Sequence, residues 1–125
     1  MILDTNALSA VAEAHTGAVA ELAKAQFIAI PVIVLGEFRF GIAQSRRRLE
    51  YERWLTASLQ SCRVLEVSAE TATCYAEIRS ELKRSGTPIP SNDAWIAALC
   101  RQHKLPLLSR DGHFDWVNGI RRLGW

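Results

Sequence analysis

Carboxylates are the side chains in this sequence with the clearest capacity for chemistry. The chain contains nine glutamates but only four aspartates, at positions 4, 93, 111 and 115. Glutamate is a good helix former and would occupy helix surfaces in any case, so the aspartates need a separate explanation. Oxygen ligands with no paired histidine or cysteine suit a hard ion. A cluster of such acids would therefore favour Mg²⁺ or Mn²⁺.

Four acids stand at positions from which they could converge on one crevice. Asp4 and Asp111 each follow a short apolar run of the kind that forms a strand, and strand ends at one edge of an open parallel sheet form a ligand crevice. Asp93 lies in the first turn of a strongly apolar helical segment, and Glu37 shares a helix face with apolar neighbours. Crowded carboxylates would raise each other's pKa values and reduce stability unless a cation lay among them.

Each of these acids also has a purely structural interpretation. Aspartate at a helix N-terminus is a common cap, which stabilises a helix by about 0.5–2 kcal/mol. Glu37 taken alone would fit a helix surface. The residues themselves leave both interpretations open, and it is the combination of four acids that favours a divalent-metal site.

The elements that would position the acids alternate between strand and helix. Apolar or alternating runs predict strands over residues 1–3, 27–30, 63–67, 105–108 and 120–123. Helical spacing, caps and breakers predict helices over residues 6–14, 17–26, 31–43, 46–61, 68–86 and 92–103. Strands that alternate with helices favour a parallel sheet covered by helices on both faces. The sequence therefore predicts one α/β domain over residues 1–125, with a short parallel sheet of four to five strands.

Several helix boundaries carry specific signals. Ser45 is the expected cap of the helix over 46–61, and Ser68 is the expected cap of the helix that Gly86 closes. The helix over 92–103 is apolar almost all round its axis, which predicts that it is buried.

Composition excludes several classes of protein. Hydrophobic residues make up 49% and charged residues 22% of the chain, as in globular proteins rather than disordered ones. Three widely spaced cysteines do not suggest a disulfide framework. No apolar run approaches the twenty or so residues of a membrane span, and no signal peptide is evident, so we expect a cytoplasmic protein. Twelve of the fifteen cations are arginines, which fits a polyanionic partner and a solvated basic surface equally well.

Four motifs, in order along the chain, resemble the PIN domain. They are ILDTN at residues 2–6, Glu37 in a mid-chain helix, NDAWIAA at 92–98 and LSRDGHF at 108–114. The resemblance covers essentially the whole chain and is closest to the VapC-type toxins of bacterial toxin–antitoxin modules. Each motif alone is weak evidence for the resemblance, whereas the four motifs in this order are specific for it.

The resemblance implies a PIN-like fold and a metal-dependent endoribonuclease, a hydrolase that uses Mg²⁺ or Mn²⁺. It assigns the catalytic and metal-binding roles to Asp4, Glu37, Asp93 and Asp111. Thr5 and Asn6 correspond to supporting residues of the first motif. Asp115 either joins Asp111 as a further ligand or faces solvent. Metal ions held by carboxylates would activate water and neutralise charge on a scissile phosphodiester, and no nucleophilic side chain is needed.

The resemblance also implies partners: an RNA substrate, a cognate antitoxin protein and a second copy of the chain in a homodimer. Arg110 is the first choice for a contact to RNA because it adjoins Asp111, followed by Arg46 and Arg47. His113 is assigned no partner.

Three other functions compete with a toxin nuclease. A phosphatase of the haloacid dehalogenase type would need a second aspartate where this chain has Asn6. A catalytically inactive PIN module that binds RNA or protein has no reason to keep all four acids. A PIN nuclease of RNA processing, with no antitoxin, stays open, although the short chain favours the toxin.

Overall fold

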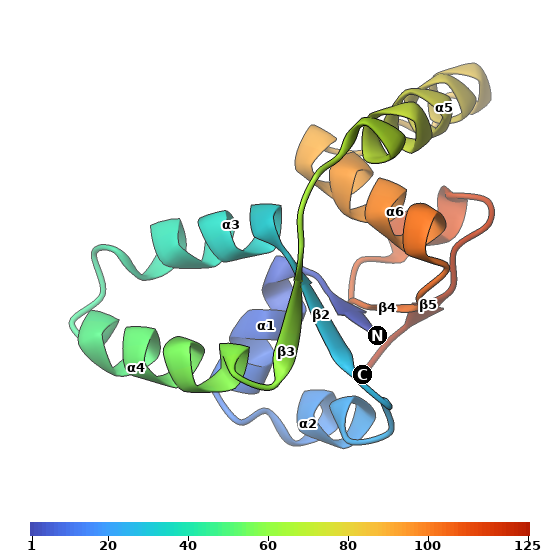
Figure 1. Ribbon diagram of the computed structural model, residues 1–125. Coiled ribbons are helices and arrows are strands. Elements are labelled where there is room, and N and C mark those ends of the chain that lie inside the picture. Colours follow the sequence, from blue (N-terminus) through green and yellow to red (C-terminus); the bar gives the residue numbers. More distant parts are fainter.

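The sheet that organises this chain is parallel throughout and has five short strands. A computed structural model describes residues 1–125, and its strands are β1 (Ile2–Leu3), β2 (Ile28–Pro31), β3 (Cys62–Leu65), β4 (Leu107–Leu108) and β5 (Arg122–Leu123). Their order is β3-β2-β1-β4-β5 (Figure 1). The chain therefore moves outward from β1 through β2 to β3 and then returns to β4 on the other side of β1. Such a reversal of strand order creates a crevice at the carboxyl ends of the two strands that flank it.

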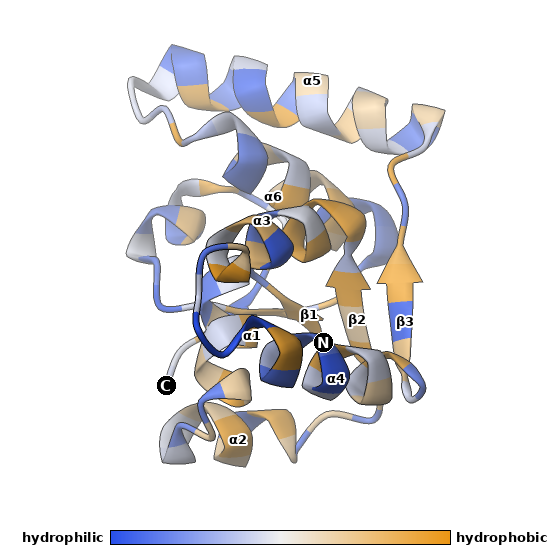
Figure 2. Ribbon diagram, turned by 90° about the vertical axis from the view of Figure 1, so that its left-hand side faces the viewer, coloured by the Kyte–Doolittle hydropathy of each residue, from blue (hydrophilic) through white to orange (hydrophobic).

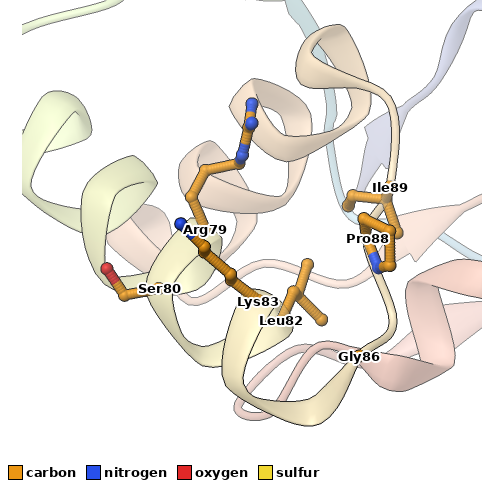
Figure 3. A pocket seen from close by; sticks show the side chains of 7 residues that line it. All are labelled: Arg79, Ser80, Leu82, Lys83, Gly86, Pro88 and Ile89. Atoms are coloured by element: carbon orange, nitrogen blue, oxygen red, sulfur yellow. The ribbon is translucent and has the colours of Figure 1, made fainter.

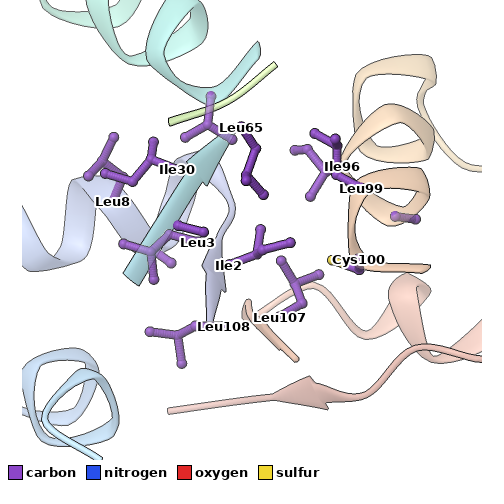
Figure 4. Close-up of a cluster of buried hydrophobic side chains, with 14 of the residues drawn as sticks. Ile2, Leu3, Leu8, Ile30, Leu65, Ile96, Leu99, Cys100, Leu107 and Leu108 are labelled. Carbon is purple, nitrogen blue, oxygen red and sulfur yellow. The ribbon is translucent and has the colours of Figure 1, made fainter. Parts of the chain in front are cut away.

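Helices cover both faces of this sheet, as predicted. They are α1 (Thr5–Ala12), α2 (Thr16–Leu22), α3 (Val32–Ile42), α4 (Arg48–Leu59), α5 (Ala69–Ser85) and α6 (Ser91–His103), with a short 3₁₀ helix η1 (Gly112–Trp116). α1 and α6 lie on opposite sides of the strands, and α5 packs outside α6 (Figures 1 and 4). The prediction of a single α/β domain with a parallel sheet is confirmed. No helix has the length and apolar character that a membrane span requires.

The core lies between the central strands and the helices on either side. Figure 4 shows Ile2 and Leu3 of β1 between Leu8 on one side and Ile96 and Leu99 on the other, and all five side chains are essentially inaccessible to water. The expected burial of α6 is confirmed, since six of its residues are buried. By contrast, α5 alternates between hydrophilic and hydrophobic residues along its length (Figure 2), as expected of a helix covered on one side only.

The expected boundaries of α5 are confirmed, whereas the expected start of α4 is wrong. Ser68 accepts a hydrogen bond from the Thr71 backbone in a capping box, and Gly86, at φ 70°, ends α5 in the left-handed conformation that glycine adopts readily. α4 begins at Arg48 rather than at residue 46, and no side chain caps it. Ser45 instead accepts a hydrogen bond from the Arg47 backbone, 3.1 Å away, within the preceding turn.

Candidate active site

Four acids predicted to share a crevice do line one pocket. We call it the carboxylate pocket; its volume is about 510 Å³, and its lining consists of Asp4, Thr5, Asn6, Glu37, Pro90, Ser91, Asn92, Asp93 and Asp111. Asp4 follows β1, Asp111 follows β4, Glu37 projects from α3 and Asp93 from the first turn of α6. The pocket thus lies where the strand order reverses. No lysine or arginine lines it.

Asp4 is the most deeply buried of the four acids, with 2% of its surface exposed. Its Oδ1 accepts a hydrogen bond from the Ala7 backbone at 2.8 Å, so it caps α1. Burial raises the pKa of Asp4 to about 6, and the charges of Asp111 and Asp93 add to the increase, against hydrogen bonds from Ser109 and Ala7 that lower it. The structural and functional interpretations of Asp4 are therefore compatible, because one residue both caps a helix and lines the pocket.

Ser109 connects two of the acids, and sequence reasoning did not assign it a role. The side chain is completely buried. Its hydroxyl donates a hydrogen bond to Asp4 Oδ2 and accepts one from the Asp111 backbone N–H at 3.0 Å. A small polar residue directly after a buried strand, two positions before an acid, is the signal that could have identified it.

Thr5 holds the carboxylate that comes from α3. Its Oγ1 donates a hydrogen bond to Glu37 Oε1 at 3.0 Å, which suits the supporting role predicted for it. Asn6 also lines the pocket, but it is exposed and its side chain makes no hydrogen bond within the protein.

Asp93 faces both its fellow acids and a histidine. Burial raises the pKa of Asp93, the nearby charges of Asp111 and Glu37 raise it further, and His113 opposes the increase. His113 Nε2 lies 2.9 Å from Asp93 Oδ2. The interpretation of His113 as a residue without a partner is therefore wrong, because η1 turns this side chain towards α6.

Asp115, the fifth candidate acid, lies outside the pocket. Its two oxygens accept hydrogen bonds from Arg122 at 2.9 and 2.8 Å, and these hydrogen bonds lower the pKa of Asp115. Of the two alternatives, the structure therefore supports the exposed one, in which Asp115 is paired with a cation on β5.

None of the three arginines predicted to contact RNA lines the carboxylate pocket. The Arg110 guanidinium lies 4.8 Å from the centre of the Trp125 ring, and Arg47 forms ion pairs with Glu50 at 3.1 Å and with Glu13 at 3.4 Å. Arg46 is exposed. The contacts to RNA stay a prediction.

A second pocket has the opposite charge. It lies between the C-terminal half of α5 and the loop that follows, and we call it the α5 pocket. Figure 3 shows Arg79 and Lys83 of α5 on one side and Pro88 and Ile89 on the other. Its volume is about 450 Å³, and no carboxylate lines it. Of these two pockets, only the carboxylate pocket has ligands suited to metal chemistry.

The donor set of the carboxylate pocket fits a divalent cation. Asp93 and Asp111 of the pocket and the adjacent His113 each place one ligand atom within 4.8 Å of the others, whereas Asp4 and Glu37 line the pocket outside this group. The pKa values of Asp4 and Asp93 are raised, so ionising these acids is costly in the metal-free protein. A bound cation would offset that cost.

Comparison with known proteins identifies the family of this chain. The model of the PIN domain family matches residues 1–120. Ribonuclease VapC2 of Rickettsia felis is 32% identical over 101 residues, which span 78% of this chain and 75% of the relative. Ribonuclease VapC5 of Mycobacterium tuberculosis is 31% identical over 94 residues, which span 74% of this chain and 70% of the relative.

Solved structures are similar over almost the entire chain. A chain in the structure of VapBC2 from Rickettsia felis, bound to a DNA fragment from its promoter, superposes with a TM-score of 0.88 at 26% identity, covering 99% of this chain and 97% of that one. A chain of FitAB bound to IR36 DNA gives a TM-score of 0.86 at 28% identity, covering 98% of this chain and 93% of that one.

Proposed function

The chain belongs to the PIN domain family, and on that premise we propose that it is a metal-dependent endoribonuclease that acts as the toxin of a toxin–antitoxin pair. The observation that carries the proposal is the convergence of Asp4, Glu37, Asp93 and Asp111 on one pocket without a protein cation. These four are the proposed catalytic and metal-binding residues. The names of the relatives, which include ribonucleases and a toxin, support the same activity.

Hydrogen bonds within the protein distinguish the parts of Asp4 and Glu37 in holding the ion and the water. A bound Mg²⁺ or Mn²⁺ lowers the pKa of water and neutralises charge on a phosphodiester. Ser109 fixes the orientation of Asp4 relative to the backbone of Asp111. Thr5 holds one oxygen of Glu37 and leaves Oε2 without a protein partner, so this oxygen is available to orient or deprotonate the attacking water.

Hydrolysis then requires no covalent intermediate with the protein. Water attacks the phosphorus, and the bond to the 3′ oxygen of the preceding nucleotide breaks. The products are a 5′-phosphate and a 3′-hydroxyl. The pocket supplies acids and amides but no serine–histidine pair that could act as a nucleophile.

The proposed partners are RNA, a cognate antitoxin and a second copy of the chain. Similar structures are named as VapBC and FitAB assemblies, which supports the antitoxin. Arg110, Arg46 and Arg47 are exposed and are the proposed contacts to the RNA backbone, in the cytoplasm where cellular RNA is found.

Cleavage of total RNA by the purified chain tests the activity. We expect degradation with Mg²⁺ or Mn²⁺, none with excess EDTA, and recovery when metal is restored. Cleavage that EDTA leaves unchanged would contradict the metal-dependent mechanism.

Co-expression tests the toxin role separately. The chain alone should arrest growth, and the product of a small neighbouring gene should relieve the arrest and co-purify with the chain. An active nuclease that neither arrests growth nor binds such a product would be an RNA-processing enzyme instead.

A further inference from the structure

His113 has an unusual environment for a histidine near a surface pocket. Its Nε2 atom is inaccessible to water and forms no aligned hydrogen bond, although it lies 2.9 Å from Asp93 Oδ2. The ring packs against Phe114, with centroids 4.8 Å apart. Asp93 is therefore the one polar group of the protein beside this buried nitrogen, and a buried nitrogen so poorly satisfied is costly. An ion beside Nε2 would remove that cost.

The distance between His113 and Asp93 matches two adjacent positions in the ligand sphere of a small divalent ion. Ligands about 2.1 Å from an octahedral ion are about 3.0 Å apart when adjacent and about 4.2 Å apart when opposite. The 2.9 Å between His113 Nε2 and Asp93 Oδ2 fits adjacent positions. Asp111 belongs to the same group, whose ligand atoms all lie within 4.8 Å of one another, so small side-chain rotations bring all three to one ion.

We propose that His113 is a nitrogen ligand of the ion in the carboxylate pocket, and that this ligand makes the site prefer Mn²⁺ to Mg²⁺. The inference rests on the proposed function, since it concerns the same ion. Mg²⁺ is bound chiefly through oxygen and gives up its water reluctantly, whereas imidazole is a good ligand for transition-metal ions. Replacing one oxygen by one nitrogen in an otherwise acidic site therefore favours Mn²⁺.

The alternative is that His113 acts only as a counter-charge to Asp93. In that case a bound ion would displace the imidazole from Asp93, and the imidazole would not coordinate the ion. The two alternatives differ in a directly measurable property, the presence of a nitrogen atom in the ligand sphere of the metal.

Pulsed electron paramagnetic resonance of Mn²⁺ bound to the purified chain detects such a nitrogen. We expect a ¹⁴N coupling that changes to the ¹⁵N pattern when the chain is labelled with ¹⁵N-histidine, a measurement that needs no variant. His113→Asn should abolish the coupling and reduce the ratio of Mg²⁺ to Mn²⁺ dissociation constants at least tenfold. His103→Asn is the matched control, because His103 is exposed at the end of α6, and it should change neither result.

Each other outcome has a defined meaning. Tight Mn²⁺ binding without a histidine coupling, or an unchanged metal preference in a folded His113→Asn variant, would overturn the role of His113 and leave the proposed nuclease intact. Failure of both Mg²⁺ and Mn²⁺ to bind the wild-type chain would contradict the proposed function itself.

Discussion

The carboxylate pocket and the α5 pocket are similar in size, at about 510 and 450 Å³, but opposite in charge. The cations of the α5 pocket are explained by local stability. Lys83 lies in the last turn of α5, where a positive charge interacts favourably with the helix dipole, and Arg79 donates a hydrogen bond to the Tyr75 hydroxyl at 2.8 Å.

The acids of the carboxylate pocket are explained in this way only in part, since Asp4 caps α1 and Asp93 lies in the first turn of α6. Burial and mutual repulsion raise the pKa values of Asp4 and Asp93, so together these acids reduce the stability of the metal-free fold. Perturbed groups in a pocket are typical of functional sites. The comparison shows that the sign of a charge cluster indicates its function less well than does the effect of the surrounding structure, which can stabilise or destabilise the charges.

Asp4→Asn should have the largest effect of any single change. The amide oxygen can still accept the hydrogen bond from Ala7, so the α1 cap survives while the charge is removed. Loss of a partner outside the ligand sphere typically reduces metal affinity or activity by about 10–100-fold. Loss of a ligand itself should therefore reduce RNA cleavage by about 100-fold or more. The rate is measured with purified protein at saturating metal.

Asp115→Asn is the matched control for this change, since it neutralises an exposed aspartate outside the pocket. It should cleave RNA at close to the wild-type rate. If Asp4→Asn also cleaves at that rate, Asp4 is only a cap.

Ser109→Ala should impair both stability and activity. It removes a buried hydroxyl that hydrogen-bonds Asp4 and the Asp111 backbone, and hydrogen bonds to charged groups contribute about 1.5–3 kcal/mol. We expect the free energy of unfolding to fall by that amount and cleavage to fall about tenfold. Urea unfolding and a cleavage assay measure the two effects.

Ser80→Ala, in the α5 pocket, provides the comparison for Ser109→Ala. Ser80 is exposed, and its replacement should change stability by less than about 0.5 kcal/mol. Equal losses of stability in the two variants would mean that the buried Ser109 hydroxyl contributes no more to the free energy of unfolding than an exposed one.

The metal-free protein should become less stable as pH rises through the titration of Asp4. Its pKa is about 6 in the folded state against an ordinary 3.8, so between these values the folded state binds more protons than the unfolded state. The free energy of unfolding therefore falls as pH rises from about 4 to above 6, by up to about 3 kcal/mol. The raised pKa of Asp93 acts in the same direction.

Urea unfolding in EDTA across this pH range measures the effect, which Asp4→Asn should largely remove. Metal affinity should rise with pH over the same interval, because the ion binds ionised carboxylates. Stability that increases from pH 4 to 7 in EDTA would show that the acids do not oppose folding.

Asp111→Asn should stabilise the metal-free chain slightly. Its charge raises the pKa values of Asp4 and Asp93, and its side chain makes no capping hydrogen bond that would be lost. We expect a melting temperature about 2–4 °C higher in EDTA, corresponding to roughly 0.5–1 kcal/mol, and a smaller increase on adding Mn²⁺. A lower melting temperature in EDTA would contradict repulsion within the pocket.

Lys83→Ala in the α5 pocket should have the smallest effect. An exposed charge of this kind contributes little to stability, and we expect cleavage within about twofold of wild type under the same assay. A larger loss of cleavage without loss of stability would show that the α5 pocket contacts the substrate, and the contrast between the two pockets would no longer hold.

Local signals were sufficient to predict most of the fold. Ser68 and Gly86 define α5 because a hydroxyl cap and a left-handed glycine act on the nearest few residues. The all-round apolar pattern of α6 predicted its burial, and alternation of strands and helices predicted the parallel sheet. The gathering of Asp4 and Asp111 followed from their places after two strands that end at the same edge.

The local partners of the acids depended on tertiary structure. Asp115 was a possible neighbour of Asp111 at helical spacing, but η1 is a 3₁₀ helix, and Arg122 of β5 draws Asp115 into an ion pair instead. The same turn directs His113 towards Asp93 on α6.

Ser109 illustrates the same limit, since its value lies in a hydrogen bond to Asp4, 105 residues away in sequence. Sequence alone identified the four acids as candidate ligands and the edge of the sheet at which they gather, because caps, turns and hydrophobic periodicity act over a few residues, but it did not identify His113. Which ligand faces which partner was decided only when the strands paired and brought distant side chains within a few ångströms of one another.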